Sequence, residues 1–154
     1  MSLSNLRNRF FQSYFRVTRP MTMGVRGLVV NEAREICLVR HTYVKGWYMP
    51  GGGIEKGETA EYALERELEE EAGIEMTGRP NLLGVFSNHD SFPNDHVLLY
   101  EVRDWRHVAA TSEGEIADHG FFSLDDLPDT ITSGTKLRLQ QWAEGVPPSR
   151  YWGR

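Results

Sequence analysis

The apolar residues of this chain fall into short runs separated by turn-forming residues. Runs rich in Val, Leu, Ile and aromatic residues, bounded by Gly, Pro, Asn or Asp, are typical of β-strands. We therefore predict strands over residues 27–31, 35–41, 47–50, 82–88, 96–104 and 119–123. The first two lie close together across the sequence NEAR, which predicts a β-hairpin.

Other stretches show apolar residues three and four apart, the spacing of an amphipathic helix. Residues 59–72 and 135–145 have this spacing, and a glycine stands at the end of each, as is common where helices stop. A third stretch, residues 5–17 within a basic segment 1–20, predicts a helix or arm packed on the domain. The tail 146–154 is expected to be extended. Strands on both sides of a central helix indicate an α/β or α+β sandwich.

The composition is that of an ordinary globular protein, 40% hydrophobic and 25% charged, and 154 residues suit one domain spanning 1–154. The single cysteine, Cys37, lies in the apolar run ICLV, which predicts a buried thiol. No apolar run approaches the roughly 20 residues of a membrane helix, and the apolar core of a secretory signal is missing. We therefore expect a cytoplasmic protein.

Charge is distributed unevenly. The net charge is −5, yet residues 55–75 contain nine glutamates against only Lys56 and Arg66. The first 26 residues contain five arginines and no acid. We expect this basic segment to belong to the domain or to a dimer contact; a membrane-surface helix is the alternative. For the glutamates, a charge run on a helix is most often a solvated face.

A helical wheel argues against that interpretation. Successive side chains are about 100° apart, so Ala60, Ala63 and Leu64 form one apolar stripe. The continuation of this stripe into the last two turns carries three carboxylates: Glu67, Glu70 and Glu71. Other glutamates of the run project to the opposite side: Glu61, Glu65 and Glu69.

Clustered carboxylates on a core-facing stripe cost several kcal/mol each unless a cation compensates them. On the wheel, Arg66 lies apart from the three carboxylates, so we expect it to neutralise them poorly. Mg²⁺ prefers carboxylate oxygens together with water and phosphate oxygens. The pattern thus predicts a divalent-cation site. The preceding glycines, Gly51, Gly52 and Gly53, let the backbone approach a ligand closely.

These residues also form a known pattern. The chain resembles the Nudix hydrolase family, whose box is G-x5-E-x7-R-E-U-x-E-E-x-G-U, with U a bulky aliphatic residue. Here the box begins at Gly52, continues through Glu58 and Arg66, and ends at Ile74, and every fixed position matches. The resemblance implies an α/β/α sandwich with a mixed sheet, in which the box forms a catalytic loop–helix–loop.

The resemblance also implies a function. It implies a pyrophosphohydrolase that cleaves a nucleoside diphosphate linked to another moiety X, with Mg²⁺ or Mn²⁺ as cofactor. Glu67, Glu70 and Glu71 match the metal-binding glutamates, and Gly51 matches a residue whose carbonyl completes the metal shell. Glu58 and Arg66 match an ion pair that shapes the loop.

Two roles stay open. The base that activates water is Glu67 or a carboxylate of the loop SEGEIADHG, for which Glu113 and Glu115 are candidates, although a solvent-exposed loop acid is an equally good interpretation of both. Candidate phosphate contacts near the glycines are Arg26, Arg40, His41 and Lys45, each also explicable as a surface charge. Trp47, Tyr48 and Phe92 could stack on a base, although aromatics in strands more often belong to the core.

The substrate itself is not specified. A nucleotide sugar, an ADP-ribose-like compound and a nucleoside triphosphate all fit the pattern, and we expect no nucleic-acid or membrane partner. A homodimer is left open. The alternative function is a Nudix-fold sensor that binds a nucleotide without turnover, but such a module would be expected to lose catalytic glutamates, and this chain keeps them.

Overall fold

The computed structural model describes residues 14, 17–112 and 114–154. The helix predicted over residues 5–17 therefore lies for the most part outside the described residues, and so does Glu113. No helix among the described residues combines the length and the apolar character needed to cross a membrane.

The predicted strands and the helices predicted over residues 59–72 and 135–145 are present, with small changes in their ends. The elements in chain order are β1 Thr22–Val29, β2 Ile36–His41, β3 Trp47–Tyr48, α2 Ala60–Ala72, β4 Ile74–Met76, β5 Asn81–Ser87, β6 Asp95–Val102, β7 Trp105–His107, β8 Ile116–Phe122 and α3 Ser133–Glu144. The short strands β4 and β7 were not predicted, because three residues are too few to show a period.

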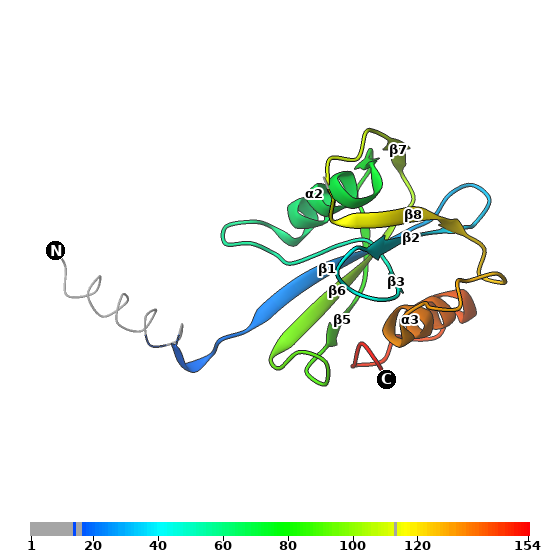
Figure 1. Ribbon diagram of the computed structural model, residues 1–154. Coiled ribbons are helices and arrows are strands. Elements are labelled where there is room, and N and C mark those ends of the chain that lie inside the picture. The colour runs from blue at the N-terminus through cyan, green and yellow to red at the C-terminus, as the bar shows by residue number, and fades with distance from the viewer. Residues whose placement is uncertain (1–13, 15–16, 113) are drawn as a thin grey trace.

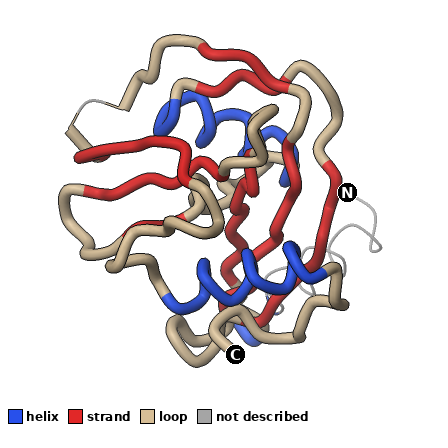
Figure 2. The backbone as a smooth tube through the Cα atoms, turned by 90° about the vertical axis from the view of Figure 1, so that its right-hand side faces the viewer, coloured by secondary structure: helices blue, strands red, loops and turns tan. Residues whose placement is uncertain are grey.

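The strands form three small sheets. Their orders are β1-β6-β5, β3-β2-β8 and β4-β7. β1 runs parallel to β6, whereas the other pairs are antiparallel. The two helices lie on opposite sides of the strands, as Figure 1 and Figure 2 show. The architecture is the α/β/α sandwich with mixed strand pairing that the sequence predicted.

The prediction of a β-hairpin over residues 27–41 is wrong, because its two strands do not pair along their length. A single bridge, Val30 to Ile36, joins the two strands before they diverge into different sheets. The turn between them is closed locally, since Asn31 and Glu35 exchange hydrogen bonds. Beyond this turn, β6 pairs with one edge of β1. The segment that contains Gly51, Gly52 and Gly53, called the glycine segment below, lies along the other edge. Non-local partners therefore displaced the local one.

Two apolar clusters lie between the layers. The inner stripe of α2, residues Ala63, Leu64 and Leu68, packs into one of them. Gly27 of β1 makes this close packing possible, because a Cβ there would overlap the Leu68 side chain. Leu139 of α3 packs into the second cluster. Cys37 is fully buried, as predicted, and burial raises the pKa of its thiol to about 12.

Candidate active site

The glycine segment lies along the free edge of β1. The Val25 N–H donates to the Gly52 carbonyl at 2.9 Å, and the Gly27 N–H donates to the Pro50 carbonyl at 2.8 Å. Gly51 has φ +142°, and a Cβ there would overlap the Val25 carbonyl oxygen. At Gly52 a Cβ would overlap the Glu67 carboxylate. The glycines thus bring the loop backbone against β1 and leave room for Glu67 beside it.

α2 places the box carboxylates next to this loop. The helix begins at the Thr59 N-cap, whose side chain accepts the Tyr62 N–H, and Gly73 ends it in the left-handed conformation. Its apolar stripe faces the core, so the last two turns bring Glu67 and Glu71 inward, as the wheel predicted. Glu70, which the wheel also placed on this stripe, stays partly exposed. The exposed fraction of the side chain is 7% for Glu71, 14% for Glu67 and 44% for Glu70.

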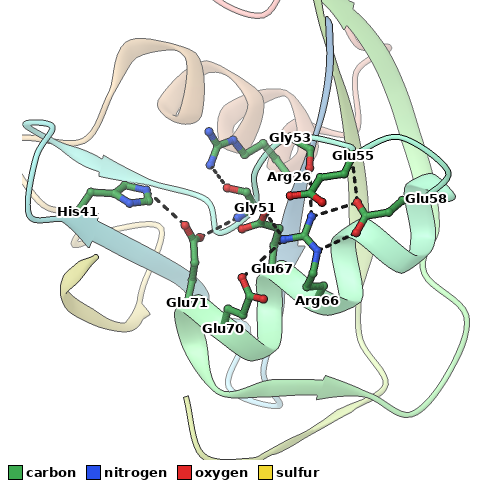
Figure 3. A network of polar contacts seen from close by, with 10 residues as sticks. All are labelled: Arg26, His41, Gly51, Gly53, Glu55, Glu58, Arg66, Glu67, Glu70 and Glu71. Atoms are coloured by element: carbon green, nitrogen blue, oxygen red, sulfur yellow. Dashed lines mark hydrogen bonds and ion pairs between the residues drawn. The ribbon is translucent and has the colours of Figure 1, made fainter. Parts of the chain in front are cut away.

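Glu71 is the most deeply buried of the three. The Gly51 N–H donates to its Oε2 at 2.9 Å, and His41 Nε2 lies 3.7 Å from its Oε1 (Figure 3). Burial raises the pKa of Glu71 to about 7, although the Gly51 hydrogen bond and Arg26 lower it. Burial and Arg26 lower the pKa of His41. Burial and the Arg26 charge thus favour the neutral imidazole of His41, which disfavours a charged pair with Glu71.

The expectation that Arg66 neutralises the carboxylates poorly is wrong for two of them. Its Nη1 donates to Glu67 Oε1 at 2.7 Å and lies 3.5 Å from Glu70 Oε2. The wheel places only Cβ directions, whereas a long guanidinium side chain can bend along the helix to reach positions i+1 and i+4. No ion pair joins Arg66 to Glu71 among the described residues.

Arg66 also forms the expected ion pair with Glu58. Its Nε and Nη2 donate to the two carboxylate oxygens at 2.9 and 3.1 Å. The same Glu58 carboxylate accepts the Glu55 N–H, and Arg66 Nη2 donates to the Gly53 carbonyl (Figure 3). Hydrogen bonding to Arg66 lowers the pKa of Glu58, and Glu58 in turn raises the pKa of Arg66. The pair ties the loop to the helix.

The three carboxylates, Glu67, Glu70 and Glu71, suit a hard divalent cation, because they supply oxygen ligands and negative charge. Burial raises the pKa of Glu67, the Glu70 charge raises it further, and the Glu67 charge raises that of Glu71. The three carboxylates thus repel one another in the protein alone. No three metal-ligating side chains of the described residues already converge as a cage. Arg66 draws Glu67 and Glu70 toward itself, while the Gly51 N–H holds Glu71.

The predicted phosphate contacts separate in the structure. Arg26 Nη1 donates to the carbonyls of Met49 and Gly51, at 3.2 and 2.7 Å, so it holds the loop carbonyl that was predicted as a metal ligand. His41 faces Glu71. Arg40 instead lies 4.0 Å from Asp118. Lys45 is exposed.

The loop acid Glu115 lies just before β8. Its side chain is exposed, and its charge raises the pKa of both Glu71 and Tyr43. Its backbone carbonyl accepts the Thr42 N–H, which holds the loop beside the end of β2. The structure therefore brings this sequence-distant acid near Glu71.

A cavity of about 570 Å³ lies beside the glycine segment, and none of the three α2 carboxylates lines it. Arg26, Gly52 and Gly53 line it together with the beginnings of β1 and α3. Of the predicted stacking aromatics, Tyr48 and Phe92 line this cavity, but Trp47 packs edge-on against Phe122 in the core.

Sequence reasoning missed several residues of this cavity: Asn88, Asp95, Thr132, Ser133, Gly134 and Trp152. The aromatic pair in the tail was the one signal that the tail packs on the domain. A larger cavity of about 750 Å³ lies at the other end of β1, beside Trp105 and His107. It contains none of the predicted site residues.

Comparison with known proteins identifies the family. The NUDIX domain model matches residues 20–142. An ADP-ribose pyrophosphatase of Methanocaldococcus jannaschii is 29% identical over 91% of this chain and 85% of that protein. A putative 8-oxo-dGTP diphosphatase of Bacillus subtilis is 44% identical over 81% of this chain and 82% of that protein.

Solved structures show the same fold. A MutT NUDIX hydrolase from Burkholderia pseudomallei superposes with a TM-score of 0.68 at 26% identity, covering 80% of this chain and 98% of that one. A UDP-X diphosphatase superposes with a TM-score of 0.63 at 27% identity, covering 94% of this chain and 74% of that one. The chain therefore belongs to the Nudix hydrolase family. It is a pyrophosphohydrolase, an enzyme that acts on phosphoric anhydride bonds, and its family requires divalent metal ions.

Proposed function

We propose that this enzyme uses Mg²⁺, with Mn²⁺ as a substitute, to cleave a nucleoside diphosphate linked to a second moiety X. One observation supports this above all: the glycine segment has the buried carboxylates of α2 on one side and an aromatic-lined cavity on the other. A diphosphate placed across the glycines would reach the carboxylates, while its nucleoside would occupy the cavity.

Glu67, Glu70, Glu71 and the Gly51 carbonyl are the proposed metal ligands. A bound cation would neutralise phosphate oxygens and lower the pKa of an attacking water. Two hydrogen bonds of the chain position these ligands. The Gly51 N–H fixes Glu71, and Arg26 fixes the Gly51 carbonyl from the other side. Glu58 and Arg66 support catalysis indirectly, because their ion pair holds the loop against the helix.

The base is assigned to Glu67, with Glu115 as the alternative. Burial raises the pKa of Glu67 and so favours proton uptake, while Arg66 opposes this. Glu115 is exposed and free to approach from the loop before β8. Glu67→Gln and Glu115→Gln separate the two assignments. Loss of the acidic limb of the pH–rate profile in only one variant identifies the base, because a general base must be deprotonated to act.

The nature of X follows less directly. The relatives are named for different substrates, ADP-ribose, 8-oxo-dGTP and a UDP conjugate. A nucleotide sugar, an ADP-ribose-like compound and a nucleoside triphosphate are therefore the proposed candidates. Arg26 is the proposed cationic contact for phosphate, since it lines the cavity beside the glycines.

A panel of these compounds with Mg²⁺, read out as released monophosphate or phosphate, tests the proposal. We expect turnover of at least one nucleotide, its loss in EDTA, and its return with Mg²⁺ or Mn²⁺. Undiminished activity in the chelator would overturn the metal-dependent mechanism. Tight binding of a nucleotide with no turnover across the panel would instead favour the sensor function.

We further propose a single cytoplasmic domain that acts on small molecules, with no nucleic-acid or membrane partner and with residues 1–17 contributing to stability or to a homodimer. Light scattering and thermal melts of the full chain and of a variant lacking residues 1–17 test this. Unchanged mass and stability, with loss of binding to anionic vesicles, would favour a membrane role for the segment.

A further inference from the structure

The C-terminal tail is attached to the edge of the sheet. Tyr151 forms a parallel bridge with Ser87 of β5. The Ser87 N–H donates to the Arg150 carbonyl and the Trp152 N–H donates to the Ser87 carbonyl, both at 2.9 Å. The tail thus follows the end of β5, and Figure 1 shows the C-terminus beside α3 and the lower ends of the strands. This pairing fixes the backbone on both sides of Tyr151.

Trp152 is positioned by this pairing at the cavity beside the glycines. Its ring meets Phe86 edge-on at 5.7 Å, and its indole covers Gly134, where a Cβ would overlap the indole nitrogen. Trp152 lines the cavity together with Tyr48 and Phe92. Its indole N–H has no hydrogen-bond partner among the described residues, and the indole nitrogen lies beside Gly134, which also lines the cavity. The cavity therefore offers an aromatic ring with an unused donor.

Arg138 of α3 holds the tail from beneath. Its side chain is buried, and its Nη1 donates to Ser149 Oγ at 2.9 Å and to the Tyr151 carbonyl at 2.7 Å. The guanidinium lies over the Phe86 ring at 4.8 Å. Its Nε and Nη2 have no hydrogen-bond partner, and no acid pairs with it among the described residues. Burying a cation without a paired acid is costly. The hydrogen bonds of Arg138 to Ser149 and Tyr151 offset part of this cost and hold the tail in place.

We infer that the end of the tail, Trp152 and Gly153, is one wall of the substrate cavity, that Trp152 contacts the purine or pyrimidine base, and that Arg138 is a positioning residue for Trp152. This rests on the proposed function. An aromatic ring that lines a cavity suits a planar base, because every base has a π-face that can stack on an aromatic side chain. The free indole N–H adds a donor for a carbonyl or ring nitrogen of that base.

The first test uses tryptophan fluorescence of the full-length protein. AMP, GMP and UMP are the base-bearing probes, and ribose 5-phosphate is the base-free probe. We expect at least one nucleotide to quench the wild type, and Trp152→Phe to lose that quenching. Trp142→Phe is the matched control, because Trp142 lies on α3 and donates to Glu101 outside the cavity. Equal quenching in Trp152→Phe and the wild type, or by ribose 5-phosphate, overturns the inference.

The second test separates binding from turnover. With a nucleotide that is hydrolysed, Trp152→Ala is expected to raise KM about tenfold with kcat within about twofold, since Trp152 contacts neither the diphosphate nor the carboxylates. Trp152→Phe should recover part of the loss. If kcat falls while KM is unchanged, Trp152 is no base contact and the inference fails.

Arg138 is tested by Arg138→Met, which keeps packing on Phe86 but removes the donors to the tail. We expect a raised KM with kcat little changed, and partial rescue in Arg138→Lys. If Arg138→Met does not fold, Ser149→Ala removes one of the two contacts and should give the same KM effect in smaller measure. An unchanged KM in the folded variants excludes the positioning role.

The two proposals fail in different ways. If no nucleotide is hydrolysed, the proposed function fails while the quenching titration still decides whether Trp152 binds a base. If hydrolysis proceeds and depends on Mg²⁺ but Trp152→Ala leaves KM unchanged, the proposed function stands and the assignment of the tail is rejected.

Discussion

The two sides of the glycine segment are built differently. On the carboxylate side most groups come from residues 51–71, a single loop and helix, and Arg26, His41 and Glu115 join them from elsewhere. On the cavity side the lining comes from segments far apart in sequence: residues 22–26, Tyr48, residues 88–97, residues 132–134 and residues 152–153. The first side concentrates carboxylates, whereas the second combines aromatic rings with polar groups and has Arg26 and Asp95 as its charged residues. Cation-dependent chemistry and selection of the nucleoside are therefore separable, and variants should separate them as kcat and KM.

The largest expected effect lies on the carboxylate side. Glu71→Gln and Glu67→Gln should each lower kcat by about 10²-fold or more with Mg²⁺ present, because each removes a proposed ligand or base. Glu69→Gln, on the other side of the same helix, is the control and should leave kcat unchanged. A Glu69 variant as impaired as the Glu71 variant would refute the assignment of faces on α2.

The segment between the two sides should be the next most sensitive. Gly51→Ala should lower the free energy of unfolding by about 3 kcal/mol, since φ +142° disfavours a side chain and the Cβ would overlap backbone. Gly53→Ala is the matched control, because a Cβ there meets nothing within 4 Å. Chemical denaturation measures both. Equal losses of stability would show that the overlap at Gly51 is relieved.

The buried acid should also give the metal-free protein a pH dependence. Because the pKa of Glu71 is about 7 in the fold and 4.5 ordinarily, the folded state binds the extra proton between these values, and stability falls as pH rises through this window. His41, whose pKa is lowered, acts in the opposite sense below about pH 6.5.

The difference between the wild type and Glu71→Gln isolates the glutamate. We expect Glu71→Gln to gain on the order of 2 kcal/mol relative to the wild type between pH 5 and pH 8 in EDTA. Denaturant melts at both pH values measure this gain. Parallel pH profiles for the two proteins would mean that burial does not penalise the Glu71 carboxylate.

The smallest effect is expected at the rim of the cavity. Phe92 is 57% exposed and lines the cavity, so Phe92→Ala should raise KM about fivefold, or about 1 kcal/mol, with kcat unchanged. Tyr62→Ala, an exposed aromatic on α2 outside this cavity, is the control. A fall in kcat for Phe92→Ala would mean that the two sides are not separable.

The local part of this protein could be predicted from its sequence. The wheel placed Glu67, Glu70 and Glu71 on the inner side of α2, because helical geometry alone relates residues three and four apart. Glu67 and Glu71 are buried there, while Glu70 stays partly exposed. Thr59 and Gly73 bound the helix by local capping. The same reasoning failed for Arg66, since a wheel fixes the direction of Cβ but not where a long side chain ends.

Tertiary structure decided what depends on non-local partners. The strands beside NEAR were predicted as a hairpin, yet β1 pairs with β6 and the glycine segment, which compete successfully with the local partner. The tail was predicted only as extended. Its position beside Ser87 involves a bridge to the end of β5 and a hydrogen bond from Arg138. Sequence by itself therefore determined the position of the proposed metal ligands, which lie within one helix and loop. Only the folded chain brought Trp152 beside that loop, because a residue 100 positions away reaches it through contacts that no local pattern records.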